Sequence, residues 1–264
     1  MASPPNPFEQ QTAITGVANV VAVSSGKGGV GKSTVACNLA LGLAKRGLRV
    51  GLLDADIYGP SLARMLGALN QKPEIDSAAR LVPVERYGLK VMSFGFLVEE
   101  DLAIVWRGPM LFKTMEQFLR GVAWGDLDVL VVDLPPGTGD VQLSLAQKVP
   151  LTGAIAVSTP QNVALMDVKK AIDMWSRLSV PLLGVVENMS WLEQGGERLQ
   201  LFPKGQLDAW LAEKQILKLA QIPFNPEVSL SGETGVPIVE GRPDGVEARA
   251  FLELAASVHA GLRL

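Results

Sequence analysis

The glycine-rich turn within VAVSSGKGGVGKST, residues 21–34, constrains the fold of this chain more than any other feature. Its GKGGVGKS portion fits the phosphate-loop pattern G-x-x-x-x-G-K-[ST], with Gly26, Gly31, Lys32 and Ser33 at the fixed positions. Such a loop works only between a strand and a helix, because amides at the helix N-terminus must face the phosphates. The preceding VVAVSS is typical of a strand and the following KSTVACNLALGLAKRG of a helix. An ordinary turn that caps a helix is the alternative, and this context disfavours it.

Further apolar runs predict the rest of the sheet. They are RVGLLDAD, DVLVVDLP, GAIAVSTP and PLLGVVENM, with LKLAQIP as a weaker sixth strand. Their continuous apolarity is typical of strands that are buried on both faces. Helix-like segments alternate with them at residues 33–46, 111–123, 141–149, 163–178 and 245–262. This alternation predicts an α/β fold, a mostly parallel sheet with helices on both faces, and LVPVERYGLKVMSFG predicts a hairpin at a sheet edge.

The composition limits the class of protein and the kinds of partner. With 24 Lys+Arg against 27 Asp+Glu the net charge is −3, which disfavours a nucleic-acid partner. No apolar run reaches the roughly 18 residues that span a bilayer, and the start MASPPNPFEQQ lacks a secretory pattern. We therefore expect no membrane partner and a cytoplasmic location. We also expect a flexible, Pro-rich arm over residues 1–16 and a single phosphate-loop domain over residues 17–264.

The glycines of the turn let backbone amides approach phosphate oxygens closely, often at positive φ. Lys32 is expected to reach the β- and γ-phosphates, and the Ser33 hydroxyl to ligate Mg²⁺. The sequence therefore predicts a nucleotide site, for ATP or ADP, at Gly26, Gly28, Gly29, Val30, Gly31, Lys32, Ser33 and Thr34.

Three carboxylates stand where two predicted strands end. Asp54 and Asp56 follow the strand RVGLLDAD, and Asp133 ends DVLVVD in the manner of a Walker B aspartate. Ligands collect at the carboxyl ends of parallel strands, so we expect all three near the phosphate loop. Asp133 is predicted to hold Mg²⁺ through water, and Asp54 to contact the waters of Mg²⁺ or the loop. A helix cap or a surface charge is the alternative for each aspartate taken alone.

Lys27 is a second lysine that the phosphate-loop pattern does not require. The stretch KGGVGKST resembles the deviant Walker A motif of the ATPases that include MinD, ParA and the nitrogenase iron protein. In that group the first lysine crosses a homodimer interface to the nucleotide of the partner subunit. The resemblance implies that Lys27 stabilises charge in trans and that hydrolysis is coupled to a homodimer. A solvated loop lysine is the alternative.

The same resemblance implies roles for further residues. Asp56 corresponds to the switch I aspartate that orients the attacking water, and Gly137 to a switch II position whose amide senses the γ-phosphate. Asn188 corresponds to the position that recognises adenine, and Pro223 to a wall of the same pocket. Lys27, Lys32 and Asp56 are thus the expected catalytic residues, and Ser33, Asp54 and Asp133 the expected metal-site residues.

Longer stretches resemble the Mrp/ApbC type within this group, the iron-sulfur cluster carrier ATPases. They are DADIYGPSLARMLG, WRGPML, VVDLPPGTGDVQLSLAQ, STPQNVALMDVKKAIDM, ENMSW and GVPIVEGRPDGVEARAF. Together they cover nearly the whole chain, from about residue 16 to residue 254. The resemblance implies a MinD-like (SIMIBI) P-loop NTPase fold and a Mg²⁺-dependent ATPase with an iron-sulfur client.

One motif of that type is missing. Its members typically carry Cys-x-x-Cys after ENMS, and the thiolates of two subunits hold one [4Fe-4S] cluster. Here the stretch reads ENMSWLEQGGERLQLFPKG, and Glu193, Gln194 and Gly195 cannot replace soft thiolates. Cys37, the single cysteine, falls in the helical run VACNLAL, where we expect a buried residue. Two functions stay open: an ATPase that serves iron-sulfur assembly with ligands from elsewhere, or an ATP-dependent dimeric switch that regulates or positions a protein partner.

Overall fold

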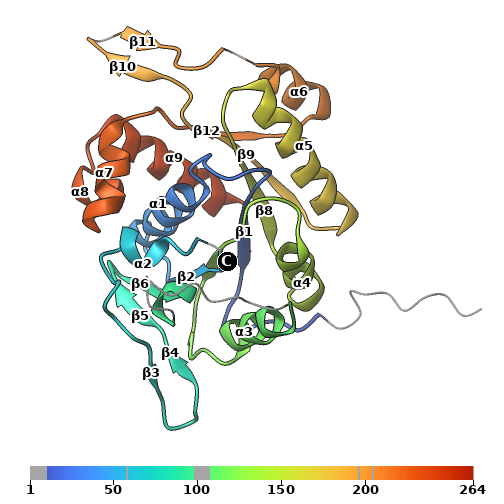
Figure 1. Cartoon of the computed structure of the whole chain (residues 1–264), viewed down its shortest axis with the longest axis vertical. Helices are drawn as coiled ribbons and strands as arrows, with labels where there is room; N and C mark the ends of the chain where they lie inside the picture. Colours follow the sequence, from blue (N-terminus) through green and yellow to red (C-terminus); the bar gives the residue numbers. More distant parts are fainter. Residues whose placement is uncertain (1–10, 58, 98–107, 196, 204, 264) are drawn as a thin grey trace, which may run out of the picture.

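An eight-stranded sheet forms the centre of the molecule (Figure 1). The structure, a computed structural model, describes residues 11–57, 59–97, 108–195, 197–203 and 205–263. The strands lie in the order β12-β9-β8-β1-β7-β2-β6-β5. They are β1 (Val20–Ser25), β2 (Val50–Asp54), β5 (Val84–Arg86), β6 (Leu89–Ser93), β7 (Val129–Asp133), β8 (Gly153–Ser158), β9 (Leu182–Glu187) and β12 (Lys218–Gln221). Neighbouring strands are parallel except β5 and β6, so the mostly parallel sheet and its edge hairpin are confirmed.

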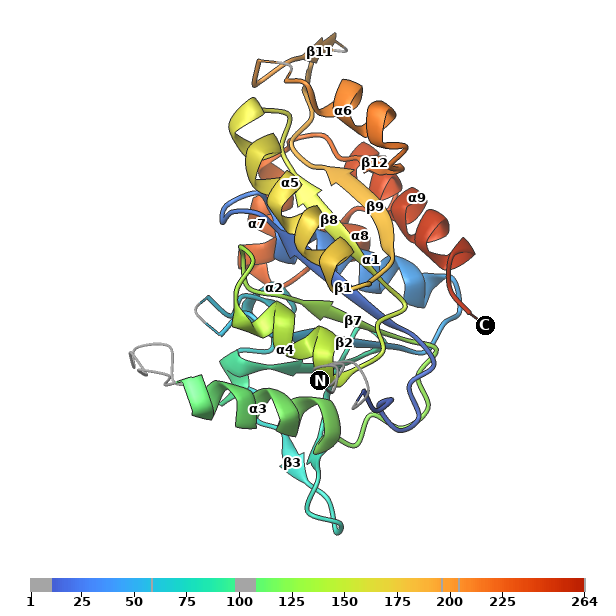
Figure 2. The ribbon, with the colours of Figure 1, turned by 90° about the vertical axis from the view of Figure 1, so that its right-hand side faces the viewer.

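Helices cover both faces of the sheet (Figure 2). One face carries α1 (Lys32–Lys45), α2 (Leu62–Met65), α7 (Pro226–Thr234), α8 (Ile238–Gly241) and α9 (Val246–Ala260). The other carries α3 (Gly108–Arg120), α4 (Asp140–Lys148), α5 (Asn162–Arg177) and α6 (Leu207–Lys214). A 3₁₀ turn, η1 (Phe94–Phe96), follows β6.

The five predicted helices correspond to α1, α3, α4, α5 and α9, each with ends shifted by a few residues. Several short elements were not predicted: α2, α6, α7, α8, the hairpin of β3 (Glu74–Ile75) with β4 (Leu81–Val82), and the hairpin of β10 (Leu192–Gln194) with β11 (Glu197–Leu199). They are too short, or too polar, to give the periodic apolar pattern on which the prediction of a helix or strand depends.

The strand β1 illustrates why the sheet sequences are continuously apolar. Val21 and Val23 belong to the core under α1 and α9, while Val20 and Ala22 belong to the core on the opposite face. Burying such a side chain contributes about 1.5–3 kcal/mol, and the strand gains this on both sides.

The register of the sheet brings the predicted carboxylates to one edge. β7 lies between β1 and β2, with Asp133 paired to Val23 on one side and to Asp54 on the other. The carboxyl ends of these three strands therefore meet beside the turn that follows β1. A crevice at this edge is the usual place for a ligand in a parallel α/β sheet.

The described residues begin at Gln11, within the expected arm of residues 1–16. Within the expected arm, residues 1–10 lie outside the described residues. The Thr12 amide donates to the Lys148 carbonyl at the end of α4, and Ile14 is buried in the core. None of the helices in the described residues has the length and apolarity needed to cross a membrane.

Candidate nucleotide-binding site

The turn between β1 and α1 has the backbone of a phosphate loop. Gly31 caps the N-terminus of α1 at φ 82°, in the left-handed region that favours glycine. A Cβ at Gly31 would lie 2.2 Å from Asn188 Nδ2, and a Cβ at Gly26 would lie 2.2 Å from the backbone of Asp167 in α5. A side chain at either position would clash with these atoms, so both positions require glycine. The unpaired amides at the start of α1 face an open cavity.

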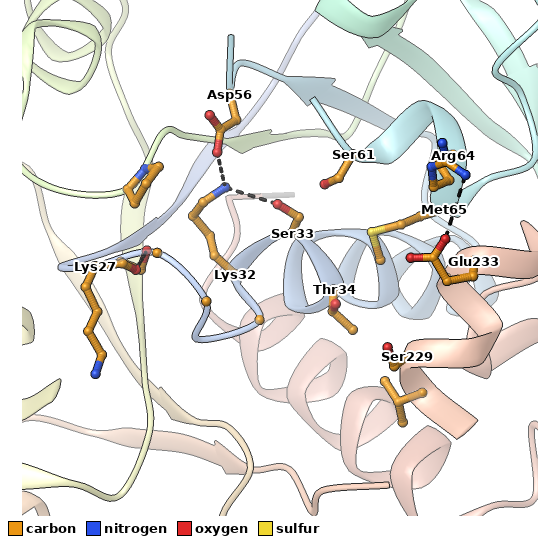
Figure 3. A pocket seen from close by; sticks show the side chains of 17 residues that line it. Lys27, Lys32, Ser33, Thr34, Asp56, Ser61, Arg64, Met65, Ser229 and Glu233 are labelled. Atoms are coloured by element: carbon orange, nitrogen blue, oxygen red, sulfur yellow. Dashed lines mark hydrogen bonds and ion pairs between the residues drawn. The ribbon is translucent and has the colours of Figure 1, made fainter. Parts of the chain in front are cut away.

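That cavity, the nucleotide cavity from here on, has a volume of about 310 Å³. The phosphate loop and the first turn of α1 form one side, and α2 and α7 form the far end (Figure 3). Its lining consists of Ser25, Lys27, Gly28, Gly29, Gly31, Lys32, Ser33, Thr34, Asp56, Ser61, Arg64, Met65, Pro136, Val228, Ser229, Gly232 and Glu233.

Lys32 stands at the centre of a buried charge cluster. Its Nζ lies 2.6 Å from Asp133 Oδ1. The same nitrogen lies 3.5 Å from Asp56 Oδ2 and donates to the Ser33 hydroxyl at 3.2 Å (Figure 3). Lys32 is 6% exposed and Asp133 is fully buried. Burial raises the pKa of Asp133 above its usual range, and the Lys32 ammonium acts in the opposite direction. The loop lysine, the loop serine and the aspartate that ends β7 are thus brought together as the sequence predicted.

Two oxygens of this cluster are left for a cation or water. Among the described residues, the buried atoms Asp56 Oδ1 and Asp133 Oδ2 have no hydrogen-bond partner. Buried acceptors normally have a partner, so these two are suited to a ligand or to the water shell of a metal. Mg²⁺ prefers oxygen ligands and usually binds one or two carboxylates together with waters and substrate phosphates. Ser33 and Asp133 fit that donor set, and Asp56 stands beside them on the same ammonium.

Asp54 lies behind the cavity and is not among its lining residues. Its carboxylate accepts hydrogen bonds from the Leu62 amide at 3.1 Å, the Ser93 hydroxyl at 2.9 Å and the Asp56 amide at 3.2 Å. Burial, and then the charge of Asp133, raise the pKa of Asp54 to about 7. Through these hydrogen bonds Asp54 stabilises the turn that carries Asp56 and that leads into α2.

Lys27 is half-exposed on the rim, and its side chain points away from Lys32 and Asp56 (Figure 3). Its carbonyl accepts from the Ser25 hydroxyl at 2.9 Å. Within the described residues its ammonium makes no ion pair, so it is available to a group outside this chain. The Gly137 amide, expected to sense the γ-phosphate, donates here to the Ser25 carbonyl at 2.8 Å.

Asn188 and Pro223, the expected adenine contacts, are both buried and do not line the nucleotide cavity. Asn188 Nδ2 donates to the Val30 carbonyl at 2.9 Å and so stabilises the phosphate loop. Their role toward a base stays a prediction.

The far end of the cavity was missed by sequence reasoning. There Arg64 of α2 lies 3.7 Å from Glu233 of α7, and Met65, Val228 and Ser229 complete the wall. One signal for α7 was present in the sequence. Asn225 caps the helix by accepting from the Glu227 amide, and Pro226 occupies its first turn, as Asn-Pro commonly does at a helix start.

The stretch after ENMS forms the β10–β11 hairpin, which carries no cysteine. Cys37 is fully buried in α1, and burial raises the pKa of its thiol far above the usual range. In the described part of the chain, no three His, Cys, Asp or Glu side chains converge on a common point. The residues present do not fit a [4Fe-4S] cluster, whose irons need thiolate ligands.

Relatives by sequence carry names that refer to iron-sulfur proteins. An iron-sulfur cluster carrier protein of Aquifex aeolicus is 49% identical over 252 residues, which is 94% of this chain and 69% of that protein. The iron-sulfur protein required for NADH dehydrogenase in Arabidopsis thaliana mitochondria is 46% identical over 251 residues, 94% of this chain and 80% of that protein.

Solved structures of other proteins share the fold of this chain. A nucleotide-binding protein of Archaeoglobus fulgidus, in complex with ADP, superposes with a TM-score of 0.74 at 38% identity, over 87% of this chain and 90% of that one. The cell division ATPase MinD of Pyrococcus furiosus gives a TM-score of 0.69 at 22% identity, over 92% and 99%, which shows the shared fold alone.

The sequence also matches, over residues 16–259, the ParA family model that describes the NUBPL iron-transfer P-loop NTPases. This match spans most of the chain, includes the whole nucleotide cavity, and agrees with the relatives of nearly half identity. The expected P-loop NTPase fold and the resemblance to iron-sulfur cluster carriers are both confirmed, and the chain belongs to the ParA/NUBPL family of iron-transfer P-loop NTPases.

Proposed function

We propose that this protein is a Mg²⁺-dependent ATPase of iron-sulfur cluster assembly or transfer, with hydrolysis coupled to a homodimer. The observation that carries the proposal is the buried cluster of Lys32, Asp133 and Asp56 beneath a phosphate loop with free helix amides. The family and the names of the relatives support the iron-sulfur role.

In this proposal the phosphates of ATP occupy the loop and draw Lys32 away from its carboxylates. The phosphate oxygens accept hydrogen bonds from the amides at the start of α1, and Lys32 Nζ moves from Asp133 to the β- and γ-phosphates. That movement leaves Asp133 and the Ser33 hydroxyl to hold Mg²⁺. The metal, when bound, neutralises charge that develops on the transferred phosphoryl group. Asp56, at the rim of the same cavity, orients the attacking water.

Lys27 completes the site of a second copy of the chain. Its direction away from its own Lys32, its half-exposure and its lack of an ion pair within the described residues support this role (Figure 3). A cation brought to the phosphates in trans makes turnover depend on dimer geometry, as an arginine finger does. We also infer that the protein has no nucleic-acid partner, on the ground of its acidic charge balance.

A second function is favoured by the cysteine content. Cys37 is the only cysteine in the sequence, and it is buried in α1, away from the β10–β11 hairpin. An ATP-dependent dimer that regulates or positions a protein partner uses the same nucleotide cavity and needs no cluster ligand. In this alternative, ATP binding orders the loops around Asp56 and Asp133, and hydrolysis relaxes them.

One experiment separates the two functions. The protein is incubated anaerobically with iron and sulfide, desalted, and analysed for iron, labile sulfide and ATP turnover, beside a Cys37→Ser control. Stoichiometric cluster that is retained supports the carrier, with ligands other than four cysteines. Absence of cluster, with ATP turnover intact, supports the partner switch. Absence of ATP turnover by the Mg²⁺-loaded protein contradicts both.

A further inference from the structure

A second cavity of about 530 Å³ adjoins the nucleotide cavity. Its lining consists of Asp56, Gly59, Pro135, Pro136, Gly139, Asp140, Val141 and Gln142. Asp56 and Pro136 line both cavities. Asp56 therefore stands between the phosphate loop and a space formed by the turn after β7 and the start of α4.

Gln142 is the least exposed polar side chain of this second cavity, with 1% of its surface exposed. Its Nε2 donates to the Pro135 carbonyl at 2.7 Å and to the Gly137 carbonyl at 3.1 Å. Because both amide hydrogens are used, the orientation of the amide group is fixed. The carbonyl oxygen Oε1 is thereby held beside Gly139, 3.6 Å from the place of a Cβ on that residue.

Gln142 Oε1 accepts no hydrogen bond from any described residue, and neither does Asp56 Oδ1. Two buried acceptors, one on each of two residues that line a single cavity, are thus left without hydrogen bonds. A buried acceptor without a donor is costly, so the arrangement favours entry of a small donor. A water molecule has two O–H donors for the two oxygens, and its lone pair then points away from both.

We propose that Gln142 is a further catalytic residue, which holds the attacking water together with Asp56, and that the second cavity admits this water. The inference rests on the proposed ATPase function. It adds to that function a second residue that contacts the reacting water, and it assigns a place from which the water arrives.

The water oxygen forms a bond to the γ-phosphorus, and the bond from that phosphorus to the β,γ-bridging oxygen breaks. ADP leaves with the bridging oxygen and its electron pair, and the two protons of the water end on the released phosphate, as H₂PO₄⁻. While the bond forms, Gln142 Oε1 and Asp56 Oδ1 accept hydrogen bonds from these two protons and fix the direction of the lone pair.

A purely structural role for Gln142 is the competing explanation, since its Nε2 also holds the turn at Pro135 and Gly137. Two variants separate the roles. Gln142→Leu removes both the oxygen and the amide donor, whereas Gln142→Glu keeps an oxygen toward the cavity and loses the donor. Gln147→Leu, the same substitution at a partly exposed position of α4 outside the cavity lining, is the matched control.

The measurement is single-turnover ATP hydrolysis with Mg²⁺, beside ADP affinity and thermal midpoint for each variant. We expect Gln142→Leu to slow hydrolysis by about 10- to 100-fold with ADP affinity within about twofold, and Gln142→Glu to retain clearly more activity than Leu. Gln147→Leu should match the wild type.

Each other result overturns the inference. If Gln142→Leu hydrolyses ATP within about twofold of the wild-type rate, Gln142 takes no part in the reaction, and the ATPase proposal still stands. If Gln142→Glu is as slow as Gln142→Leu, the loss of turnover comes from the turn that Nε2 holds and not from the missing oxygen. Loss of ADP affinity, or of folding, in both variants leads to the same conclusion. A wild-type protein without turnover overturns the ATPase proposal, and this inference falls with it.

Discussion

Lys32 Nζ lies 2.6 Å from Asp133 Oδ1, although 101 positions separate the two residues in the chain. The contact is buried, and Asp56 Oδ2 lies on the same ammonium at 3.5 Å. Lys32 thus neutralises Asp133, the carboxylate that the proposed Mg²⁺ site requires. The proposed function gives the same lysine a second role, in binding the phosphates of the nucleotide.

Lys32→Ala is expected to weaken ATP binding by about 100-fold or more, because a charge-assisted contact to the phosphates is lost. It should also lower the free energy of unfolding by about 3–5 kcal/mol, since Asp133 stays buried without its cation. Calorimetric titration with ATP and urea unfolding measure the two effects.

The double variant Lys32→Ala/Asp133→Asn is the control for this prediction. It should recover much of the stability, because the uncompensated charge is removed, and none of the ATP affinity. Tight ATP binding by Lys32→Ala would show that the loop lysine does not reach the phosphates.

Gly31→Ala should lower the thermal midpoint of the protein without nucleotide, whereas Gly28→Ala should not. A Cβ at Gly31 meets Asn188 Nδ2 at 2.2 Å and requires a side chain at φ 82°, while a Cβ at Gly28 meets no heavy atom of the described residues within 4 Å. Strain of this kind costs roughly 1–3 kcal/mol. The thermal midpoint of each variant without nucleotide is the measurement. Equal losses in the two variants would mean that the loop does not keep this conformation in solution.

Cys37 should resist alkylation in the folded protein. Its thiol is fully buried and its pKa is raised by that burial, so little thiolate forms at pH 8. We expect iodoacetamide, followed by intact mass, to leave the native chain unmodified and to label it once in 6 M guanidinium. Rapid labelling of the native protein would contradict the packing of α1.

Asp54 should make stability depend on pH. Its pKa is about 7 in the folded chain and about 3.9 in an unfolded one, so between these values the folded state binds more protons. The Asp54 contribution to the free energy of unfolding therefore falls as pH rises from about 4 to about 7. The side chain in the Asp54→Asn variant does not titrate. The free energy of unfolding of this variant, relative to that of wild type, should therefore rise as pH rises from about 4 to about 7.

Urea unfolding of both proteins without nucleotide, at pH 5 and pH 7.5, measures the Asp54 effect. The quantity of interest is the stability difference between the two proteins, because groups that do not interact with Asp54 contribute equally to both. A difference that does not change between the two pH values would mean that Asp54 is ionised throughout.

The parts of the fold that the sequence predicted are those with a local signal. β1, β2 and β7 are buried on both faces and therefore read as unbroken apolar runs, and the turn before Lys32 carries a fixed pattern. The meeting of Lys32 with Asp133 followed from the rule that the ends of parallel strands share an edge.

What the sequence did not predict depends on distant contacts. α2 is one turn long and α7 has few apolar positions, so neither gives a helical period, yet Arg64 and Glu233 from these helices close the nucleotide cavity. Ser229 comes nearly two hundred positions after Lys32, and only tertiary packing places it there. The inward direction of Asp54 depends on Ser93 and Leu62, which no local pattern connects.

The proposed function is that of a homodimeric ATPase in which Lys27 acts on the nucleotide of the partner subunit. Its most direct test mixes two inactive chains, Lys27→Ala, which keeps its own phosphate loop, and Lys32→Ala, which keeps Lys27. In a mixed dimer, the nucleotide on the Lys27→Ala chain receives the intact Lys27 of its partner. We expect little turnover from either variant alone and about a quarter of the wild-type rate from an equal mixture, since half of the dimers then hold one complete site. Wild-type turnover by Lys27→Ala alone, or a mixture no faster than the sum of its parts, would contradict it.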